Sequence, residues 1–138
     1  MEWALHRYIL HGLGKKKNSK FAYHWHGHHR TVRKKSFYDP GYDTPLKGDS
    51  RREIISLAIL LAAHAPLATI SWLLYVVLAL CTARYYYLHR KMHLYPTWGR
   101  MRFPCHWDHH MGKNQNANWS VTCEWPDRLM GTRIKTPK

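Results

Sequence analysis

The sequence predicts an all-α, membrane-anchored protein, with a short helical hairpin at about residues 54–83 and a histidine-rich helical cap facing the cytoplasm. Three observations support this fold class. The stretch from Ile54 to Ala83 carries no formal charge, histidines gather in short clusters on both sides of it, and basic residues flank both its ends. The chain has 22 Lys and Arg against 8 Asp and Glu, a formal net charge of +14. Such a charge favours an anionic partner, either nucleic acid or the anionic face of a membrane.

The uncharged stretch fits a hairpin better than a single crossing. As one straight helix it would be about 45 Å long, whereas the hydrocarbon core of a bilayer is about 30 Å thick. Pro66 offers a break near its middle, because proline disfavours helix in the residue before it. Lys and Arg at both ends place both flanks on the cytoplasmic side. The alternative is a hairpin buried in a soluble core. His64, near the turn, is expected to be structural.

The rest of the chain reads as short helices joined by loops. Glycines after residue 11 are expected to end the first helix, and turn-forming Pro, Gly and Asp indicate an irregular loop before the hairpin. Three widely spaced cysteines without a CxxC pair argue against a disulfide framework and a cysteine zinc site. The expected elements are a helix at 1–12, a basic linker at 15–20, a loop at 31–50, the second hairpin helix from about 67 to 93, a loop at 94–104, a helix at 106–112 and a basic tail.

The histidines carry the strongest chemical signal in a chain that holds 12 of them. Residues three and four apart share a helix face, and neutral imidazole is the commonest metal ligand in proteins. One structural zinc needs about four ligands, so ten imidazoles favour two metals with about five ligands each and an open position for oxygen or water. The candidate ligands form four clusters: His6 and His11; His24, His28 and His29; His89 and His93; and His106, His109 and His110.

Two positions within these clusters are ambiguous. His6 and His11 are five residues apart, so a regular helix would splay them and a distorted turn is needed for both to bind one metal. His26 competes with His24, because it stands three residues before His29. The stretch from His89 to His110 is expected to form one half of the two-metal centre, and the histidines before the hairpin the other half.

The sequence resembles the fatty acid hydroxylase/sterol desaturase superfamily of membrane histidine-box oxygenases. The resemblance rests on LHRYILHG, HWHGHH, LHRKMH and HWDHH as four boxes in order, and on the tail NANWSVTCEWPDRLMGT. It covers nearly the whole chain, as a single domain over residues 1–138. The family usually carries a pair of membrane helices before the first box, whereas this chain begins five residues ahead of His6, and Trp125-Pro126-Asp127 stands where the family has a Trp-Asp pair.

The resemblance implies a non-haem di-iron oxidoreductase that uses O2 to oxidise a C–H bond of a fatty acyl, sterol or related lipid. Two iron ions would be the cofactors, with zinc as a substitute in purified protein, and the ten histidines would be the ligands. The implied partners are a membrane lipid and a separate electron-donor protein, with no nucleic acid. Two alternatives remain open: a basic histidine-rich metal-binding or nucleic-acid-binding module, and an inactive remnant of the hydroxylase family.

Overall fold

The computed structural model describes residues 1–136, and every regular element in that range is helical, as predicted. Pro137 and Lys138, the end of the predicted basic tail, lie outside the described residues. The elements in chain order are α1 (Glu2–Ala4), η1 (Leu5–Leu13), η2 (Tyr23–His29), α2 (Arg30–Lys34), η3 (Pro40–Tyr42), α3 (Gly48–Ala63), α4 (Leu67–Ile70), α5 (Trp72–Leu94), α6 (Pro96–Arg102), α7 (Pro104–Met111) and α8 (Trp125–Leu129).

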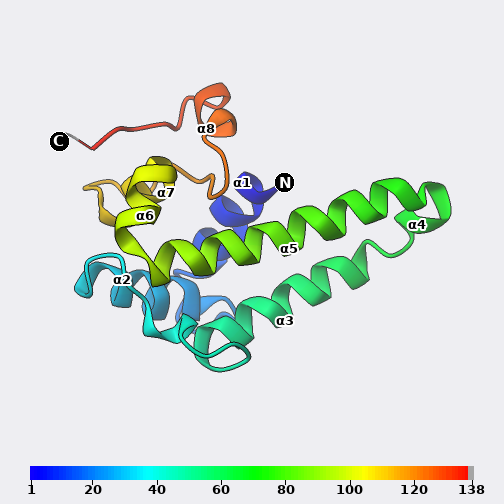
Figure 1. Cartoon of the computed structure of the whole chain (residues 1–138), viewed down its shortest axis with the longest axis horizontal. Coiled ribbons are helices and arrows are strands. Elements are labelled where there is room, and N and C mark those ends of the chain that lie inside the picture. The colour runs from blue at the N-terminus through cyan, green and yellow to red at the C-terminus, as the bar shows by residue number, and fades with distance from the viewer. Residues whose placement is uncertain (137–138) are drawn as a thin grey trace.

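The predicted hairpin consists of α3 and α5, which project side by side from the body of the molecule with α4 at their tip (Figure 1). The Tyr75 hydroxyl donates to the Leu61 carbonyl across the hairpin at 3.3 Å. The second long helix begins at Trp72 rather than near Leu67, because Ser71 is extended and its side chain caps the new helix. None of the helices in residues 1–136 combines the length and the apolar character that crossing a membrane requires.

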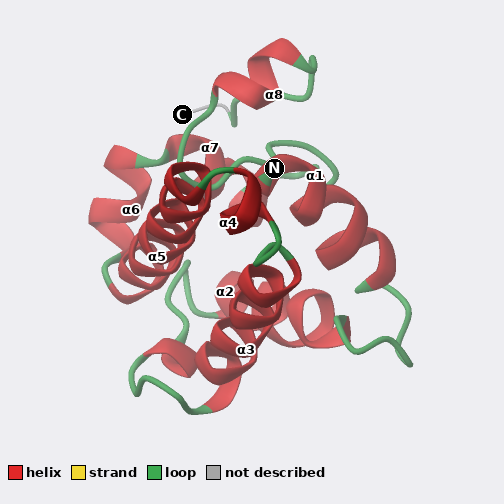
Figure 2. Cartoon of the chain, turned by 90° about the vertical axis from the view of Figure 1, so that its right-hand side faces the viewer, coloured by secondary structure: helices red, strands yellow, loops and turns green. Residues whose placement is uncertain are grey.

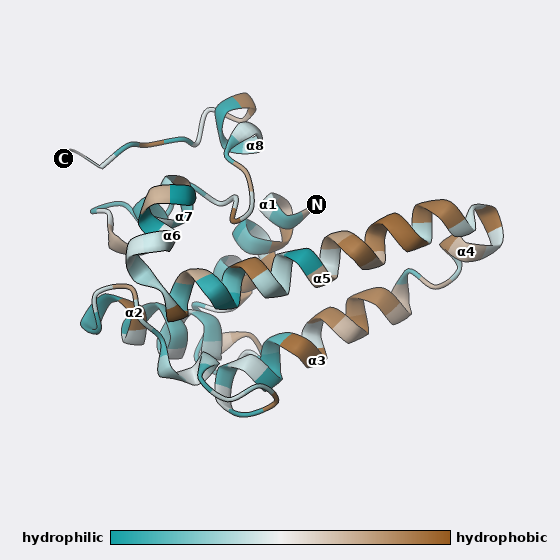
Figure 3. Cartoon of the chain, viewed as in Figure 1, coloured by the Kyte–Doolittle hydropathy of each residue, from teal (hydrophilic) through white to brown (hydrophobic). Residues whose placement is uncertain are grey.

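Hydropathy divides the molecule along the hairpin axis. The outer parts of α3 and α5 are apolar, whereas the body is mostly polar (Figure 3). Viewed toward the tip, the two long helices stand in front of a body in which the other helices surround their bases (Figure 2). Nine large apolar side chains of the hairpin expose 40 % or more of their surface: Ile55, Ile59, Ile70, Trp72, Leu73, Leu74, Val76, Val77 and Leu80.

The core of the body is small and lies at the base of α5. Val32, Phe37, Met92 and Val121 form its buried cluster. Aromatic side chains from α6 and α7 pack against this cluster, which joins the last third of the chain to α5.

Two predicted loops contain helices. The region 94–104 was expected to be a loop, but α6 occupies Pro96–Arg102. Both Pro96 and Pro104 stand in the first turn of a helix, where the missing N–H costs no hydrogen bond, so these prolines start helices instead of breaking them. The region 31–50 likewise includes most of α2, the short η3 and the first residues of α3.

Candidate metal centre

Ten histidines from four helices (η1, η2, α5 and α7) converge inside the body, and none exposes more than 4 % of its surface. Such burial is unusual for an imidazole, because a buried polar ring must find partners for its nitrogens. The ten are those predicted from the sequence: His6, His11, His24, His28, His29, His89, His93, His106, His109 and His110.

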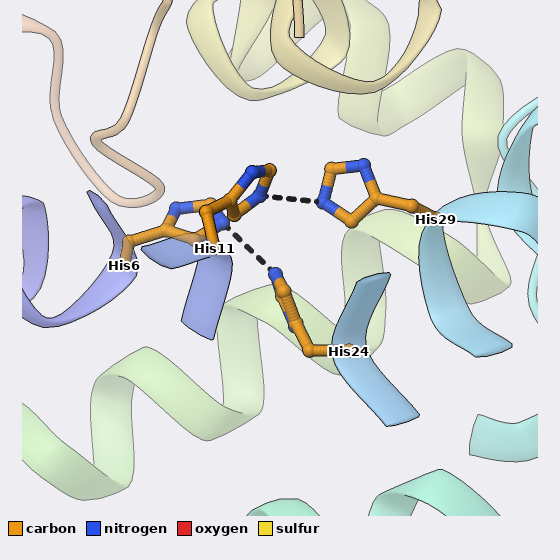
Figure 4. Close-up of side chains that lie close together, drawn as sticks. All are labelled: His6, His11, His24 and His29. Atoms are coloured by element: carbon orange, nitrogen blue, oxygen red, sulfur yellow. Dashed lines mark hydrogen bonds between the residues drawn. The ribbon is translucent and has the colours of Figure 1, made fainter. Parts of the chain in front are cut away.

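Cluster A combines the N-terminal histidines with one from α7. Each of His6, His11, His24 and His29 offers a ring nitrogen within 4.8 Å of those of the other three, and Figure 4 shows the four rings pointing toward one another. The Nε2 atoms of His6 and His24 are 3.1 Å apart. The Nε2 atom of His11 lies 3.0 Å from that of His29 and also 3.0 Å from that of His109. His109 thus completes a group of five.

Cluster B lies beside cluster A and is built mainly on α5 and α7. Its ring nitrogens, one each from His28, His89, His93 and His110, also lie within 4.8 Å of one another. The Nε2 atom of His106 is 3.1 Å from that of His93, so this group also has five members. The two clusters adjoin where the rings of His29 and His110 have centroids 4.1 Å apart.

Neighbouring histidines of one box belong to different clusters. His28 is in cluster B and its neighbour His29 in cluster A. Likewise, His110 is in cluster B and its neighbour His109 in cluster A. The stretch His89–His110 supplies five of the ten rings, four in cluster B and one in cluster A, so the boundary between the two clusters does not follow the division of the chain by the hairpin. Adjacent residues on a helix point about 100° apart, so each HH pair spans the boundary between the two groups.

Two π-helices bring residues five apart in the chain onto one face. η1 carries His6 and His11, and η2 carries His24 and His29, and within each pair the ring centroids are 5.0 Å apart. The hydrogen bonds of a π-helix join residues i and i+5, and such turns occur frequently at functional sites. This is the distorted turn that the spacing of His6 and His11 requires. The same distortion at His24 and His29 was not anticipated.

Several rings donate a hydrogen bond from the nitrogen that faces away from the cluster to a fixed backbone carbonyl. His6 Nδ1 donates to the Trp119 carbonyl at 2.7 Å, His109 Nδ1 to the Ala117 carbonyl at 2.7 Å, and His93 Nδ1 to the Phe37 carbonyl at 2.9 Å. A carbonyl only accepts, so the proton of each neutral ring resides on Nδ1 and the Nε2 lone pair is free. Metal-ligating histidines typically have such partners.

The ring nitrogens that face one another inside the clusters carry too few protons for each of them to take part in a hydrogen bond. His11 Nε2 lies between two other Nε2 atoms, and one proton serves only one of them. In cluster B, the buried Nε2 atoms of His28, His89 and His110 have no hydrogen-bond partner within residues 1–136. A cation among these lone pairs would satisfy them together, so the donor set fits a metal ion in each cluster.

Burial keeps these rings neutral. Loss of solvation lowers the pKa of His109 to about 4. The same effect, with repulsion from neighbouring imidazoles, lowers the pKa of eight others: His6, His11, His24, His28, His29, His93, His106 and His110. Neutral imidazole is the form that binds a metal, so these rings are ready to act as ligands at neutral pH.

The two remaining histidines lie apart from both clusters. His26 Nε2 is 3.0 Å from the Lys15 carbonyl at the surface, so the geometry favours His24 over His26 as a candidate ligand. His64 Nδ1 is 2.8 Å from the Leu60 carbonyl near the hairpin tip, which fits the structural role expected for it.

Sequence reasoning missed the buried acids that support the rings. Asp127 accepts from the backbone N–H groups of Trp119 and Ser120 at 2.8 and 2.7 Å, and from the Trp3 indole at 3.2 Å. Asp127 thereby fixes the segment 117–120, whose carbonyls at Trp119 and Ala117 accept from His6 and His109. The conspicuous WPD tripeptide was the only sequence signal for it. Asp39 and Glu53 are bonded to His28 and His89. Asp39 was expected only as a turn former and Glu53 was not singled out.

An all-helical body enclosing two adjoining groups of buried histidines defines a helical protein with a histidine-box metal site. The fatty acid hydroxylase family model matches residues 1–132. The chain belongs to the fatty acid hydroxylase family, within the fatty acid hydroxylase/sterol desaturase superfamily. Neither the curated proteins nor the solved structures include a significant match to it. Membership of this family supports the prediction that the chain is an oxidoreductase.

Proposed function

We propose that this chain is a di-iron, O2-dependent hydroxylase that oxidises a C–H bond of a membrane lipid, such as a fatty acyl chain or a sterol. One observation carries the proposal: ten buried histidines form two adjoining groups of five, with free lone pairs facing inward. Four ligands suffice for a structural zinc. Ten neutral imidazoles in two groups suit two metal ions.

The side chains of this protein have three tasks at the proposed centre. The ten histidines would hold the two iron ions, and the carbonyls and carboxylates behind them orient the rings. Burial of every ring would keep bulk water away from the bound metals. The iron ions would supply O2 activation and C–H oxidation, with electrons from a separate donor protein. The chain provides ligation, orientation and a dry site.

The hairpin supports a lipid substrate. Soluble proteins rarely expose a contiguous apolar surface as large as the one along the outer parts of α3 and α5. We propose that a bilayer covers this surface and that the hairpin enters the bilayer from its tip. α5 then leads from the lipid directly to His89 and His93. A lipid could thus reach the centre along the hairpin.

Vesicle flotation tests the hairpin. Full-length protein should float with phospholipid vesicles, and Leu73→Ser with Leu74→Ser should leave most of it in the aqueous fraction. Leu129→Ser is the control, because Leu129 is even more exposed (74 %, against 56 % for Leu73 and 58 % for Leu74) but lies on α8, away from the hairpin. If the double variant floats like the wild type, the hairpin is not the lipid-binding element. Recovery without lipid but with bound RNA or DNA would favour a nucleic-acid-binding module.

Isotope incorporation tests the reaction. The purified chain in lipid nanodiscs, loaded with Fe²⁺ and supplied with a reductant, should incorporate one atom of ¹⁸O from ¹⁸O2 into a lipid alcohol. His24→Ala and His93→Ala should each abolish this product, whereas His26→Ala should retain it. Full iron loading without labelled product from acyl, sphingolipid and sterol substrates would favour an inactive remnant.

A further inference from the structure

Two buried carboxylates contact the histidines of cluster B. His28 Nδ1 lies 2.6 Å from an oxygen of Asp39, and His89 Nδ1 lies 2.7 Å from an oxygen of Glu53. Asp39 exposes 2 % of its surface and Glu53 7 %. The second oxygen of Glu53 accepts from the Tyr42 hydroxyl at 2.7 Å, and the second oxygen of Asp39 accepts from the Gly41 N–H at 2.8 Å. Each acid is therefore fixed in place.

Cluster A has no such support within the described chain. His6 and His109 donate to backbone carbonyls. His29 Nδ1 lies 3.0 Å from the Gln115 amide, and His11 Nδ1 is buried without a partner. The groups that hold these cluster A rings are thus neutral: two carbonyls accept from His6 and His109, and the Gln115 amide N–H donates to His29 Nδ1. Two of the five rings of cluster B are instead backed by acids.

This difference in charge affects metal binding. A carboxylate behind a histidine raises the basicity of that ligand and orients its ring. It also places a negative charge close to the metal, in an interior where charges are poorly screened. Ten neutral imidazoles would leave the full charge of two divalent cations uncompensated. The two acids that contact a ring directly, Asp39 and Glu53, both stand behind cluster B, whereas Asp127 reaches cluster A only through the backbone that holds His6.

We propose that Asp39 and Glu53 make the two metal positions unequal, so that cluster B binds its ion more tightly and fills first. Both acids act as positioning residues through His28 and His89. The inference rests on the proposed two-metal centre, which it deepens.

The order of filling can be measured with Co²⁺, whose visible absorption reports its ligands. Metal-free full chain is titrated with Co²⁺ alone, and the spectrum of the first equivalent is compared with those of two reference variants. His24→Ala removes a cluster A ligand, and His93→Ala removes a cluster B ligand. The first equivalent in the wild type should match the spectrum of His24→Ala. A first equivalent that matches His93→Ala, or a mixture of both, would overturn the proposal.

The role of the two carboxylates is tested by adding a second substitution to the His24→Ala and His93→Ala variants. Glu53→Gln and Asp39→Asn keep an oxygen for the Nδ1–H group but remove the charge. In the His24→Ala background each should weaken Co²⁺ binding about 10–100-fold, and in the His93→Ala background neither should change it. Glu124→Gln is the control, because Glu124 pairs with Arg128 and Arg133 and touches no histidine. Equal weakening in both backgrounds, or none in either, would contradict the proposal.

The outcomes separate this inference from the proposed function. A wild-type chain that binds no Co²⁺ lacks a metal centre, which overturns both. A chain that binds two equivalents with equal affinity retains the proposed centre but refutes the inequality. Circular dichroism accompanies each variant, and the order of filling in the wild type stands independently of how Glu53→Gln and Asp39→Asn fold.

Discussion

His6 and His11 face each other with ring centroids 5.0 Å apart, although five residues separate them along η1. On an α-helix that spacing would turn the two side chains about 140° from each other. The π-helical backbone removes this divergence, and η2 does the same for His24 and His29. Because π-helices are rare, two of them under one cluster indicate that the ligand geometry determines the local backbone.

Removing the metal should loosen η1 and η2. Without a cation the inner lone pairs oppose one another, so the π-helical turns lose their main support. A site saturated about 1,000-fold above its dissociation constant contributes about 4 kcal/mol to the free energy of unfolding. Hydrogen exchange measured by mass spectrometry, with and without chelator, should show faster exchange in residues 5–13 and 23–29 than at the middle of α5. Unchanged exchange in both segments would show that they do not depend on a metal.

His24→Ala should lower the bound metal to about one ion per chain, whereas His26→Ala should leave it unchanged. His24 is buried among the cluster A rings, whereas Nε2 of His26 lies 3.0 Å from the Lys15 carbonyl near the surface. The two substitutions remove the same side chain two residues apart on η2, so each serves as the control for the other. Elemental analysis after dialysis gives the ratio. Equal metal loss in both variants would place His26 among the ligands.

Asp127→Asn should destabilise the protein by about 3 kcal/mol, because a fully buried carboxylate that accepts several hydrogen bonds would be replaced by a group with fewer acceptor sites. Metal content should fall as well, since Asp127 fixes the carbonyl that holds His6. Urea unfolding measures the first effect and elemental analysis the second. Glu124→Gln is the control and should cost less than about 1 kcal/mol, because its ion pairs are partly solvated. Equal effects of the two substitutions would show that Asp127 has no special structural role.

The metal-free protein should lose stability as the pH falls below about 6.5. In the unfolded chain these histidines take up a proton near their ordinary pKa of about 6.5, whereas burial lowers the pKa of the folded rings. The unfolded state therefore binds more protons below that pH, and the free energy of unfolding rises as the pH rises toward 6.5 and then levels off. Thermal melts of chelated protein from pH 5 to 8 measure this. Constant stability from pH 7 down to 5 would contradict it.

The sequence predicted the ten histidines because their spacing is local and their number is extreme. It also predicted the hairpin, since charge is absent over a long stretch and basic residues flank both ends. It could not divide the histidines between two clusters, because the division of His28 from His29 depends on how four helices meet. Nor could it find Glu53, which lies 36 residues before His89 and reaches it only because α3 packs beside α5. Helix α6 was missed because Pro96 and Gly99 also fit a loop.

Metal stoichiometry tests the central claim most directly. Iron and zinc are quantified on the purified full-length chain, beside His24→Ala and His93→Ala. We expect about two metal ions per chain in the wild type and about one in each variant. A wild-type chain that retains its helical content but binds no metal, or only one ion that both variants lose, would contradict the two-cluster centre.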